Sequence, residues 1–478
     1  MVAPRTTELA RLRESTKIGD MSLRHLPILL VLVWVAVSCG PPQKLNVVII
    51  TLDTLRADRL GAYGYERNTS PHFDALAEKS VLFEDAYAQA VVTSPSHMSM
   101  MTGLRPHSHG VFKNGDRLQT EMPTLAERLA ERGYQTGAFV SGTVLAEDLS
   151  DVSRGFEDFD AEFDTYRRGA RATTTAARNW LQSLAPETPY FMFVHYYDTH
   201  GRYRATPERI ARFRRDVPPR PIEVPVYQRK NKSEDEFHED LEYYSDVYDA
   251  AIQQQDELFA RLLRVIDRDR SIVVVLADHG ESLGERLLKL DHGHYLFDEQ
   301  TRIPLLLSAP GLEPRRVSGL VETSDLVPTL LDLLGIETTD EFDGRSLSAS
   351  LRTGEASPRE NAVTVASWSD GAIADRDYDL DKRYPVVSLV TDGKSRWKLI
   401  RYPGIQGPVE ELFDLKVDGL EKLDVAEMQT DVVAELGARL DAKLPSFRHY
   451  ERPPLGEELK SRLEALGYTD SQRFPFGR

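Results

Sequence analysis

Three strongly apolar segments restrict this chain more than any other feature of its sequence. They are residues 45–50, 190–197 and 272–276. Nearly continuous runs of apolar, mostly β-branched or aromatic residues are typical of strands in a parallel sheet that is covered on both faces. The acids Asp53, Asp198 and Asp278 follow these segments. A single acid after a strand is usually a turn or cap residue, but the carboxyl ends of parallel strands share one edge, where ligands bind in open α/β sheets.

Helical segments alternate with the predicted strands. Helices are predicted at 70–79, 123–132, 171–184, 241–267 and 325–335, and further strands at 81–89, 135–142 and 303–311. This alternation predicts one α/β domain over residues 46–350, built on a doubly wound, mainly parallel sheet. Residues 202–240 are rich in Arg, Pro and charge, and we interpret them as a long surface loop. Residues 285–302 form a second polar loop in this interpretation.

The sequence pattern changes near residue 350. Segments such as AVTVAS, VVSLVT and RWKLIRY alternate in the manner of antiparallel strands. The chain from Asp431 onward is predicted to be helical. We therefore predict a smaller α+β subdomain with a helical tail over residues 351–478.

The first 39 residues have the pattern of a secretory signal. A short apolar run at 26–37 follows Arg24 and His25 and precedes small residues. It is shorter than the roughly 20 apolar residues that a membrane-spanning helix requires. Met21 is an alternative start, because the residues before it would make an unusually long polar leader.

Cys39 is the only cysteine of the chain. The segment AVSC that ends there resembles the lipobox of bacterial lipoproteins, whose cysteine is lipidated and becomes the mature N-terminus. A plain cleaved signal or an uncleaved anchor is the alternative. We predict lipidation at Cys39, a linker at 40–45, and an exported, membrane-anchored lipoprotein that faces the periplasm or the cell exterior. The mature protein would contain no disulfide.

The charge of the chain argues against a polyanionic partner. Asp and Glu number 76 against 59 Lys and Arg, which gives a formal charge of −17. A field of this sign repels nucleic acid. We therefore expect no nucleic-acid partner.

The stretch TSPSHMSMMTG at residues 93–103 is predicted to enter a helix. Pro95 suits the first helical turn, and Thr93 or Ser94 is expected to cap it. A hydroxyl group at a helix N-terminus lies at the positive end of the helix dipole, which favours a tetrahedral anion. An ordinary capped helix is the alternative interpretation.

Asp53, Thr93, Asp198 with His200, and Asp278 with His279 are expected at one edge of the sheet. Two aspartates and a histidine suit a divalent metal such as Zn²⁺ or Mn²⁺. A metal beside Thr93 would lower the pKa of its hydroxyl and make it a nucleophile. Nearby histidines would bind a substrate oxyanion or protonate the leaving group.

Long collinear motifs in this chain resemble the sulfatase family of the alkaline phosphatase superfamily. They include LNVVIITLDTLRADRLGAYGY, TSPSHMSMMTGLRPHSHGV, VHYYDTH, LADHGESLGE, DHGHYLFDEQTRIPLLLSAPG and DLVPTLLDLLGI. The resemblance runs from residue 46 to about residue 430 and implies a sulfatase-like hydrolase of phosphate or sulfate esters.

One departure from the family pattern changes the implied chemistry. Sulfatases carry Cys-x-Pro-Ser-Arg, or Ser in the first place, and convert that first residue to formylglycine. Here Thr93 occupies the place of the nucleophile and His97 that of the arginine. Threonine at this place resembles the family's phosphodiesterases, phosphomutases and phosphoethanolamine-type transferases, in which a covalent phosphothreonine forms.

The resemblance also implies roles for residues around Thr93. Asp53, Thr93, Asp278 and His279 are the implied metal ligands, for Zn²⁺ or Mn²⁺ with Ca²⁺ and Mg²⁺ as alternatives. Asp53-Thr54 replaces the usual pair of aspartates and weakens a calcium site. We assign catalytic roles to Thr93, His200 and His292, and substrate contacts to His97, Lys113, Asn114 and Asp198. A second metal at Asp198, His200 and His292 is the alternative, as is a solvated-loop role for Lys113 and Asn114.

The leading hypothesis is an exported, metal-dependent hydrolase of phosphate or sulfate esters on a small molecule, glycan or lipid. One alternative is a sulfuric ester hydrolase that works without formylglycine. Another is a transferase that moves a phospho-headgroup onto a lipid or glycan, although such enzymes usually carry several membrane helices. The last is a non-catalytic binding lipoprotein, against which the retained acids, Asp-His pair and hydroxyl argue.

Overall fold

The computed structural model describes most of the chain after residue 43. The described residues are 44–163, 166–201, 203–214, 234–285, 292–293, 295–366, 386–391, 396–402 and 408–443. The chain from Leu45 onward forms one compact unit. The predicted signal, the predicted lipidation at Cys39 and the whole tail after Lys443 lie outside the described residues. No helix among the described residues is long and apolar enough to cross a membrane.

The main sheet has eight strands in the order β4-β3-β5-β1-β6-β7-β2-β8. The strands are β1 (Asn46–Leu52), β2 (Val81–Tyr87), β3 (Gln135–Phe139), β4 (Asp158–Asp160), β5 (Tyr190–Tyr196), β6 (Ser271–Leu276), β7 (Arg302–Ser308) and β8 (Arg315–Glu322). All neighbouring pairs are parallel except those that include β7. The predicted mainly parallel α/β sheet is therefore confirmed.

The three central strands place the candidate site. Every residue of β1, β5 and β6 is buried, as expected for strands covered on both faces. Thr51 of β1 is in register with His195 of β5 on one side and Leu276 of β6 on the other. The residues that follow these positions therefore leave the sheet at the same edge.

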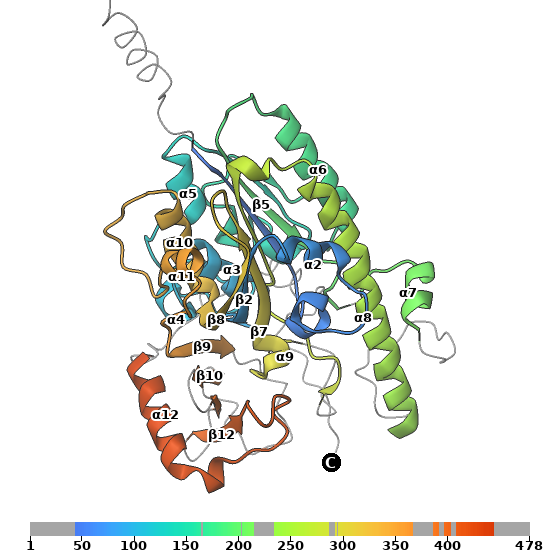
Figure 1. Ribbon diagram of the computed structural model, residues 1–478, viewed down its shortest axis with the longest axis vertical. Helices are drawn as coiled ribbons and strands as arrows, with labels where there is room; N and C mark the ends of the chain where they lie inside the picture. Colours follow the sequence, from blue (N-terminus) through green and yellow to red (C-terminus); the bar gives the residue numbers. More distant parts are fainter. Residues whose placement is uncertain are drawn as a thin grey trace, which may run out of the picture. The chain divides into compact units, whose positions relative to one another are not determined.

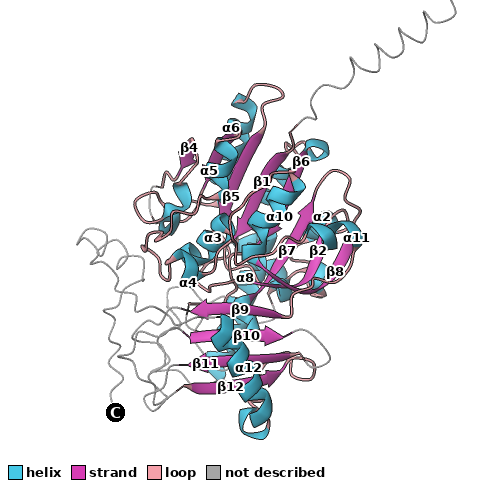
Figure 2. Ribbon diagram, turned by 90° about the vertical axis from the view of Figure 1, so that its left-hand side faces the viewer, coloured by secondary structure: helices cyan, strands magenta, loops and turns pink. Residues whose placement is uncertain are grey.

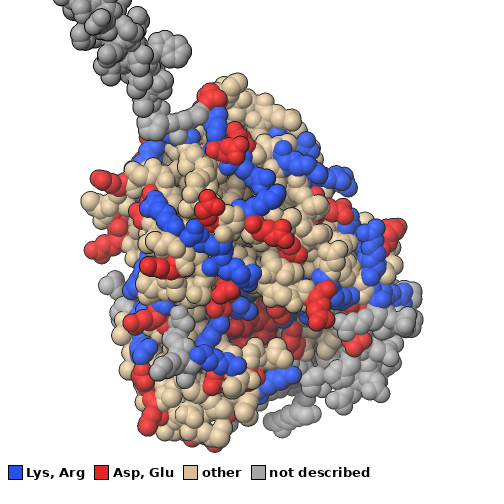
Figure 3. Space-filling model, in the orientation of Figure 1, with Lys and Arg blue, Asp and Glu red and all other residues tan. Residues whose placement is uncertain are grey.

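Helices cover both faces of the sheet (Figure 1). One layer contains α2 (Pro71–Ala77), α6 (Ala170–Ser183) and α8 (Glu234–Leu263), with α7 (Pro207–Phe213) packed on α8. The other contains α3 (Thr93–Thr102), α4 (Pro106–His109), α5 (Leu125–Ala130), α10 (Leu326–Leu333) and α11 (Ser348–Thr353). Acidic and basic side chains are interspersed on the face shown in Figure 3.

Two predicted loops contain helices. The predicted loop 202–240 is wrong in part, because it contains α7 and the start of α8. Pro207 stands directly after the N-cap Thr206, and proline at the first helical position is a start signal that the many charges around it obscured. The polar loop 285–302 likewise contains the short helix α9 (Asp298–Thr301).

The C-terminal strands form a separate sheet, as predicted. Strands β9 (Asn361–Ala366), β10 (Val386–Thr391), β11 (Trp397–Tyr402) and β12 (Val409–Asp414) are antiparallel in the order β12-β11-β10-β9. Helix α12 (Thr430–Lys443) packs on this sheet through Leu436 and Leu440 (Figure 2). The domain boundary near residue 350 stays a prediction.

The two sheets are tied by a buried lysine. Lys398 of β11 is fully buried, and its Nζ lies 2.8 Å from Asp298 Oδ1 and 2.8 Å from Glu421 Oε1. Asp298 begins α9, and the amide of Gly280 donates to the carbonyl of Gln300 in the same helix at 2.8 Å. The small sheet is therefore connected through α9 to the turn that follows β6.

Candidate active site

Three predicted metal ligands meet at the carboxyl edge of the central strands. Asp53 follows β1, and Asp278 and His279 follow the neighbouring strand β6. One possible ligand atom from each of the three lies within 4.8 Å of the others. All three side chains are fully buried.

Each carboxylate has one oxygen held by the protein and one oxygen left over. Asp53 Oδ2 lies 2.9 Å from Nε2 of His195. Asp278 Oδ1 accepts from the amides of Thr54, at 3.1 Å, and His279, at 2.9 Å. The other oxygens, Asp53 Oδ1 and Asp278 Oδ2, have no hydrogen-bond partner among the described residues.

The third predicted ligand, His279, is oriented in the same way. Its Nδ1 lies 2.9 Å from the carbonyl oxygen of Gly280, so Nδ1 carries the proton and Nε2 presents a lone pair. Nε2 has no hydrogen-bond partner in the described part of the chain. Buried polar atoms are normally paired. Two carboxylate oxygens and an imidazole nitrogen that converge unpaired therefore fit a divalent cation.

The electrostatics of the cluster also favour a cation. Burial, and next the charge of Asp278, raise the pKa of Asp53 well above its usual value. Burial would also raise the pKa of Asp278, but His279, His97 and His195 together hold it below the usual value. Burial lowers the pKa of His279. Without a cation, one of two adjacent buried carboxylates tends to take up a proton.

Thr93 is the first residue of α3 rather than its cap. The N-cap is Val92, whose side chain makes no capping hydrogen bond, so the predicted capping by Thr93 or Ser94 is wrong. Ser94 Oγ donates to the carbonyl of Val144 at 3.1 Å, and its amide donates to Asn114 Oδ1 at 2.9 Å. Thr93 Oγ1 is buried and has no hydrogen-bond partner among the described residues. The hydroxyl thus remains available for chemistry.

The first turn of α3 is docked against the turn that carries Asp278 and His279. Ser96 Oγ donates to the carbonyl of Asp278 at 2.6 Å. His97 Nδ1 donates to the carbonyl of Thr93 at 2.8 Å and lies 3.7 Å from Asp278 Oδ2. His97 Nε2 lies 3.1 Å from Thr51 Oγ1. His97 is therefore held between α3 and β1, and the substrate contact assigned to it stays a prediction.

Two further predicted histidines extend the site from His279. The ring centroid of His292 lies 4.5 Å from that of His279 and 4.8 Å from that of His200. The ring of His200 stacks on Tyr197 with the centroids 4.1 Å apart. A Cβ on Gly293 would lie 3.3 Å from Val92 Cγ2. The segment that carries His292 therefore packs against the residue before Thr93.

The remaining predicted residues lie around this centre. Asp198 Oδ2 accepts from the amide of Ala170 at the start of α6, at 2.7 Å, and burial raises its pKa to about 6. Asn114 meets α3 through the amide of Ser94. Lys113 precedes it and is half-buried. Their substrate contacts stay predictions.

For four residues that support this site, the sequence predicted no role. They are Thr54, His195, Thr199 and Glu281. Glu281 Oε1 lies 3.1 Å from His292 Nδ1. His195 was visible as a lone histidine inside a buried apolar strand, and Glu281 as an acid three residues after Asp278. Thr54 was visible as the residue in place of the usual second aspartate, and Thr199 gave no comparable signal.

Comparison with known proteins gives the fold and site a family context. The family profile described as Sulfatase matches residues 45–336. A second profile, described as N-sulphoglucosamine sulphohydrolase, C-terminal, matches residues 290–449. The first profile spans more than half of the chain and the whole candidate site.

Individual relatives cover most of this chain. A Delta 4,5-hexuronate-2-O-sulfatase of Bacteroides thetaiotaomicron is 26% identical over 447 residues, covering 84% of this chain and 88% of that protein. An ulvan-active sulfatase of Formosa agariphila is 25% identical, covering 95% and 91%. The crystal structure of a phosphonate monoester hydrolase of Agrobacterium radiobacter superposes with a TM-score of 0.67 at 18% identity, covering 85% and 96%. The last comparison confirms the fold.

Proposed function

This chain belongs to the sulfatase family and is an ester hydrolase, and from that premise we propose that it cleaves phosphate esters through Thr93 with a bound divalent cation. The observation that carries the proposal is the hydroxyl of Thr93. It is buried and without a hydrogen-bond partner among the described residues, and it begins the helix docked on Asp278. The only cysteine is Cys39, so a cysteine-derived formylglycine is not available.

The residues present divide the reaction among them. A divalent cation held by Asp53, Asp278, His279 and Thr93 would lower the pKa of the threonine hydroxyl and offset negative charge on the ester. Thr93 gives up its hydroxyl proton to water, and its Oγ1 then forms a bond to phosphorus while the bond from phosphorus to the leaving oxygen breaks. His292, with protons on both ring nitrogens, donates the Nε2 proton to that oxygen, while Glu281 Oε1 accepts from its Nδ1. His200, whose pKa burial holds well below its usual value, stays neutral and contacts the substrate. Water finally cleaves the phosphothreonine.

Sulfate esters are the second candidate substrate class. The relatives favour it, since one is a Delta 4,5-hexuronate-2-O-sulfatase and another an ulvan-active sulfatase. In this alternative unmodified Thr93 attacks sulfur. Both names refer to sulfatases that act on glycan-type substrates, so a glycan ester is included among the proposed substrates.

The proposed setting is the outer side of a bacterial membrane. The lipobox-like AVSC segment supports lipidation of Cys39 after export. Replacement of Cys39 by Ser should then release the protein from membranes into the soluble fraction. Continued membrane association of the variant would refute the anchor and leave the catalytic proposal intact.

A substrate panel tests the catalytic proposal. The soluble form from residue 40 onward is assayed with nitrophenyl phosphate, phosphodiester, phosphonate and sulfate esters in Mn²⁺ or Zn²⁺. Intact-mass spectrometry of the quenched reaction should show one phosphoryl group on the wild type and none on Thr93→Ala. A faster reaction with sulfate esters would favour the second candidate. Turnover without any dependence on Thr93 would remove the proposed nucleophile.

A further inference from the structure

The residue after the metal ligand Asp53 has an unusual backbone. Thr54 is fully buried and has a φ of 56°. A β-branched residue in this left-handed region is a conformational outlier, which persists only where its surroundings hold it. The contacts of Thr54 show what holds it there.

Thr54 and Thr199 bind each other's chain segments reciprocally. The hydroxyl of Thr54 donates to the carbonyl of Thr199 at 2.6 Å. The hydroxyl of Thr199 donates to the carbonyl of Asp53, also at 2.6 Å. Both threonines are fully buried. The pair thereby joins the turn after β1, which carries Asp53, to the turn after β5, which carries His200.

The backbone of Thr54 is also bonded on both sides. Its amide donates to Asp278 Oδ1 at 3.1 Å, which leaves Oδ2 of that carboxylate to face the cation site. Its carbonyl accepts from the hydroxyl of Tyr248 on α8 at 2.6 Å. The same hydroxyl accepts from the amide of Arg56 at 3.0 Å. Tyr248 thus links the turn after β1 to helix α8.

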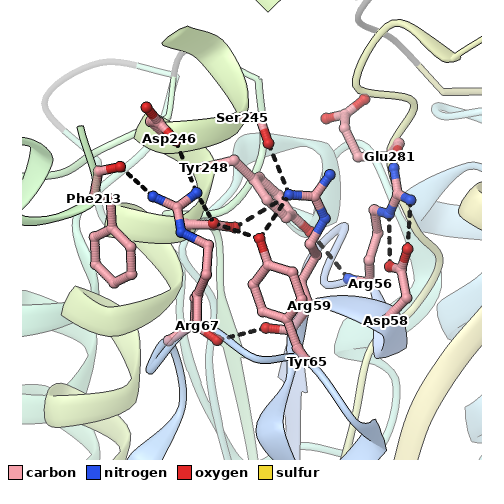
Figure 4. Close-up of polar contacts among 12 residues, drawn as sticks. Arg56, Asp58, Arg59, Tyr65, Arg67, Phe213, Ser245, Asp246, Tyr248 and Glu281 are labelled. Atoms are coloured by element: carbon pink, nitrogen blue, oxygen red, sulfur yellow. Dashed lines mark hydrogen bonds and ion pairs between the residues drawn. The ribbon is translucent and has the colours of Figure 1, made fainter. Parts of the chain in front are cut away.

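Arg56 extends this connection to the second ligand turn. Its Nη1 donates to the carbonyl of Glu281 at 3.1 Å, and Figure 4 shows Arg56 between Tyr248 and Glu281. Asp58 and Glu285 pair with the same guanidinium. The turns after β1, β5 and β6 are therefore bonded to one another through Thr54, Thr199 and Arg56.

We propose that Thr54 is a positioning residue for the metal site, which it serves through its left-handed backbone and its hydroxyl link to Thr199 and not as a ligand. Its amide orients Asp278, its hydroxyl fixes the distance to the turn that carries His200, and its neighbour Asp53 is thereby aimed at the same point. Partners that orient metal ligands typically contribute 10–100-fold to metal affinity. The inference rests on the metal site of the proposed function.

Mn²⁺ titration by calorimetry tests this role on the metal-free protein. We expect Thr54→Val and Thr199→Val each to raise the Kd for Mn²⁺ by about 10–100-fold. Thr54→Ser keeps the hydroxyl and should stay within about twofold of the wild type. Thr54→Gly accepts the φ of 56° without strain but lacks the hydroxyl, so it should weaken binding as the valine variant does.

Thr136→Val is the matched control. Thr136 is fully buried and its hydroxyl donates to the carbonyl of Gly155 at 2.8 Å, away from the three turns. We expect it to leave the Kd for Mn²⁺ within about twofold of the wild type. If Thr54→Val does not fold, Thr199→Val tests the same link from its other side.

The outcomes separate this inference from the proposed function. Wild-type protein that binds neither Mn²⁺ nor Zn²⁺ would overturn both. Wild-type binding that is lost in Asp278→Asn but unchanged in Thr54→Val and Thr199→Val would overturn the positioning role alone. Equal weakening by Thr136→Val would also overturn it, because any buried hydroxyl would then have the same effect.

Discussion

Nε2 of His195 lies 2.9 Å from Oδ2 of Asp53, and both side chains are fully buried. The amide of Ser141 donates to Nδ1 of the same ring at 3.4 Å. Nδ1 therefore accepts and Nε2 donates, which fixes one neutral tautomer. Burial lowers the pKa of His195 to about 4, in agreement with a neutral ring. Asp53 is left with a single oxygen for a cation.

Removal of this hydrogen bond should weaken metal binding. We expect His195→Leu to raise the Kd for Mn²⁺ by about 10–100-fold, whereas His195→Gln, which can place an amide N–H near Nε2, should lose less. His109→Leu is the control, because His109 is equally buried and bonds to Ser99 and Val111 instead. Unchanged affinity in His195→Leu would contradict the role.

The nucleophile is tested by two neighbouring hydroxyl groups. Thr93→Ala should lower kcat/KM on the best ester by about 10³-fold or more, because the bond-forming oxygen is lost. Ser94→Ala removes a hydroxyl that donates to the carbonyl of Val144, and it should stay within about tenfold. Steady-state kinetics on both variants measures the difference. Comparable losses in the two would point to a packing effect.

Metal binding should stabilise the fold through Asp53. At a Mn²⁺ concentration 100 times the Kd, binding adds about 2.7 kcal/mol to the free energy of unfolding. In Asp53→Asn this gain should largely disappear. The metal-free variant should be at least as stable as the metal-free wild type, because the pKa of Asp53 is raised by burial and by Asp278. Thermal unfolding with Mn²⁺ and with a chelator measures both effects, and an equal Mn²⁺ response in the two proteins would refute the assignment.

Asp256 lies away from the active site, and its buried carboxyl group should make the free energy of unfolding depend on pH. Burial raises its pKa to about 7, although the amides of His72 and Phe73 donate to it. Between the unfolded pKa of about 3.9 and pH 7, the folded chain binds more protons at this residue than the unfolded chain. The contribution of Asp256 to the free energy of unfolding is therefore complete below pH 4 and is lost as the pH rises through 7.

Asp256→Asn removes this titration. The stability of the variant relative to the wild type should therefore rise between pH 5 and pH 8, by at most about 3 kcal/mol. Urea unfolding of both proteins at the two pH values gives this double difference, in which other titrating groups cancel. If this double difference is zero or has the opposite sign, the hydrogen bonds from the two amides keep the carboxylate ionised.

Lys398 should contribute far more to stability than its neighbour on the same strand. Lys398→Met leaves Asp298 and Glu421 buried without their cation, and breaking a buried ion pair in this way costs about 3–5 kcal/mol. Arg401 also lies on β11, but it pairs with Glu410 and Asp441 near the surface, so Arg401→Met should cost about 1 kcal/mol or less. Chemical unfolding distinguishes the two, and similar losses would contradict the role of burial.

The central strands and the meeting of three predicted ligands followed directly from the sequence. Strands β1, β5 and β6 are buried on both faces, so their composition alone identified them. Parallel pairing then required that the residues after them meet at one edge, and Asp53, Asp278 and His279 do so. The antiparallel character of β9, β10 and β11 followed from their alternation in the same way.

The supporting contacts could not be predicted in that way. Thr54 reaches the carbonyl of Thr199 across 145 positions of the chain, and His195 reaches Asp53 across 142. Such bonds depend on side-chain conformers and on a left-handed turn, neither of which the residue type at 54 suggests. The predicted cap at Thr93 failed because the helix already includes Thr93 and has Val92 as its N-cap.

The buried triad of Lys398, Asp298 and Glu421 also bears on how such a chain can change over generations. A recombination event near residue 350 that paired this large sheet with a foreign small sheet would bring Asp298 from one ancestor and Lys398 with Glu421 from the other. Unless the foreign sheet supplied a buried cation at the same place, the hybrid protein would contain the buried carboxylate of Asp298 without the positive charge that compensates it. The two sheets are therefore expected to descend together, and substitutions at these three positions to occur in concert.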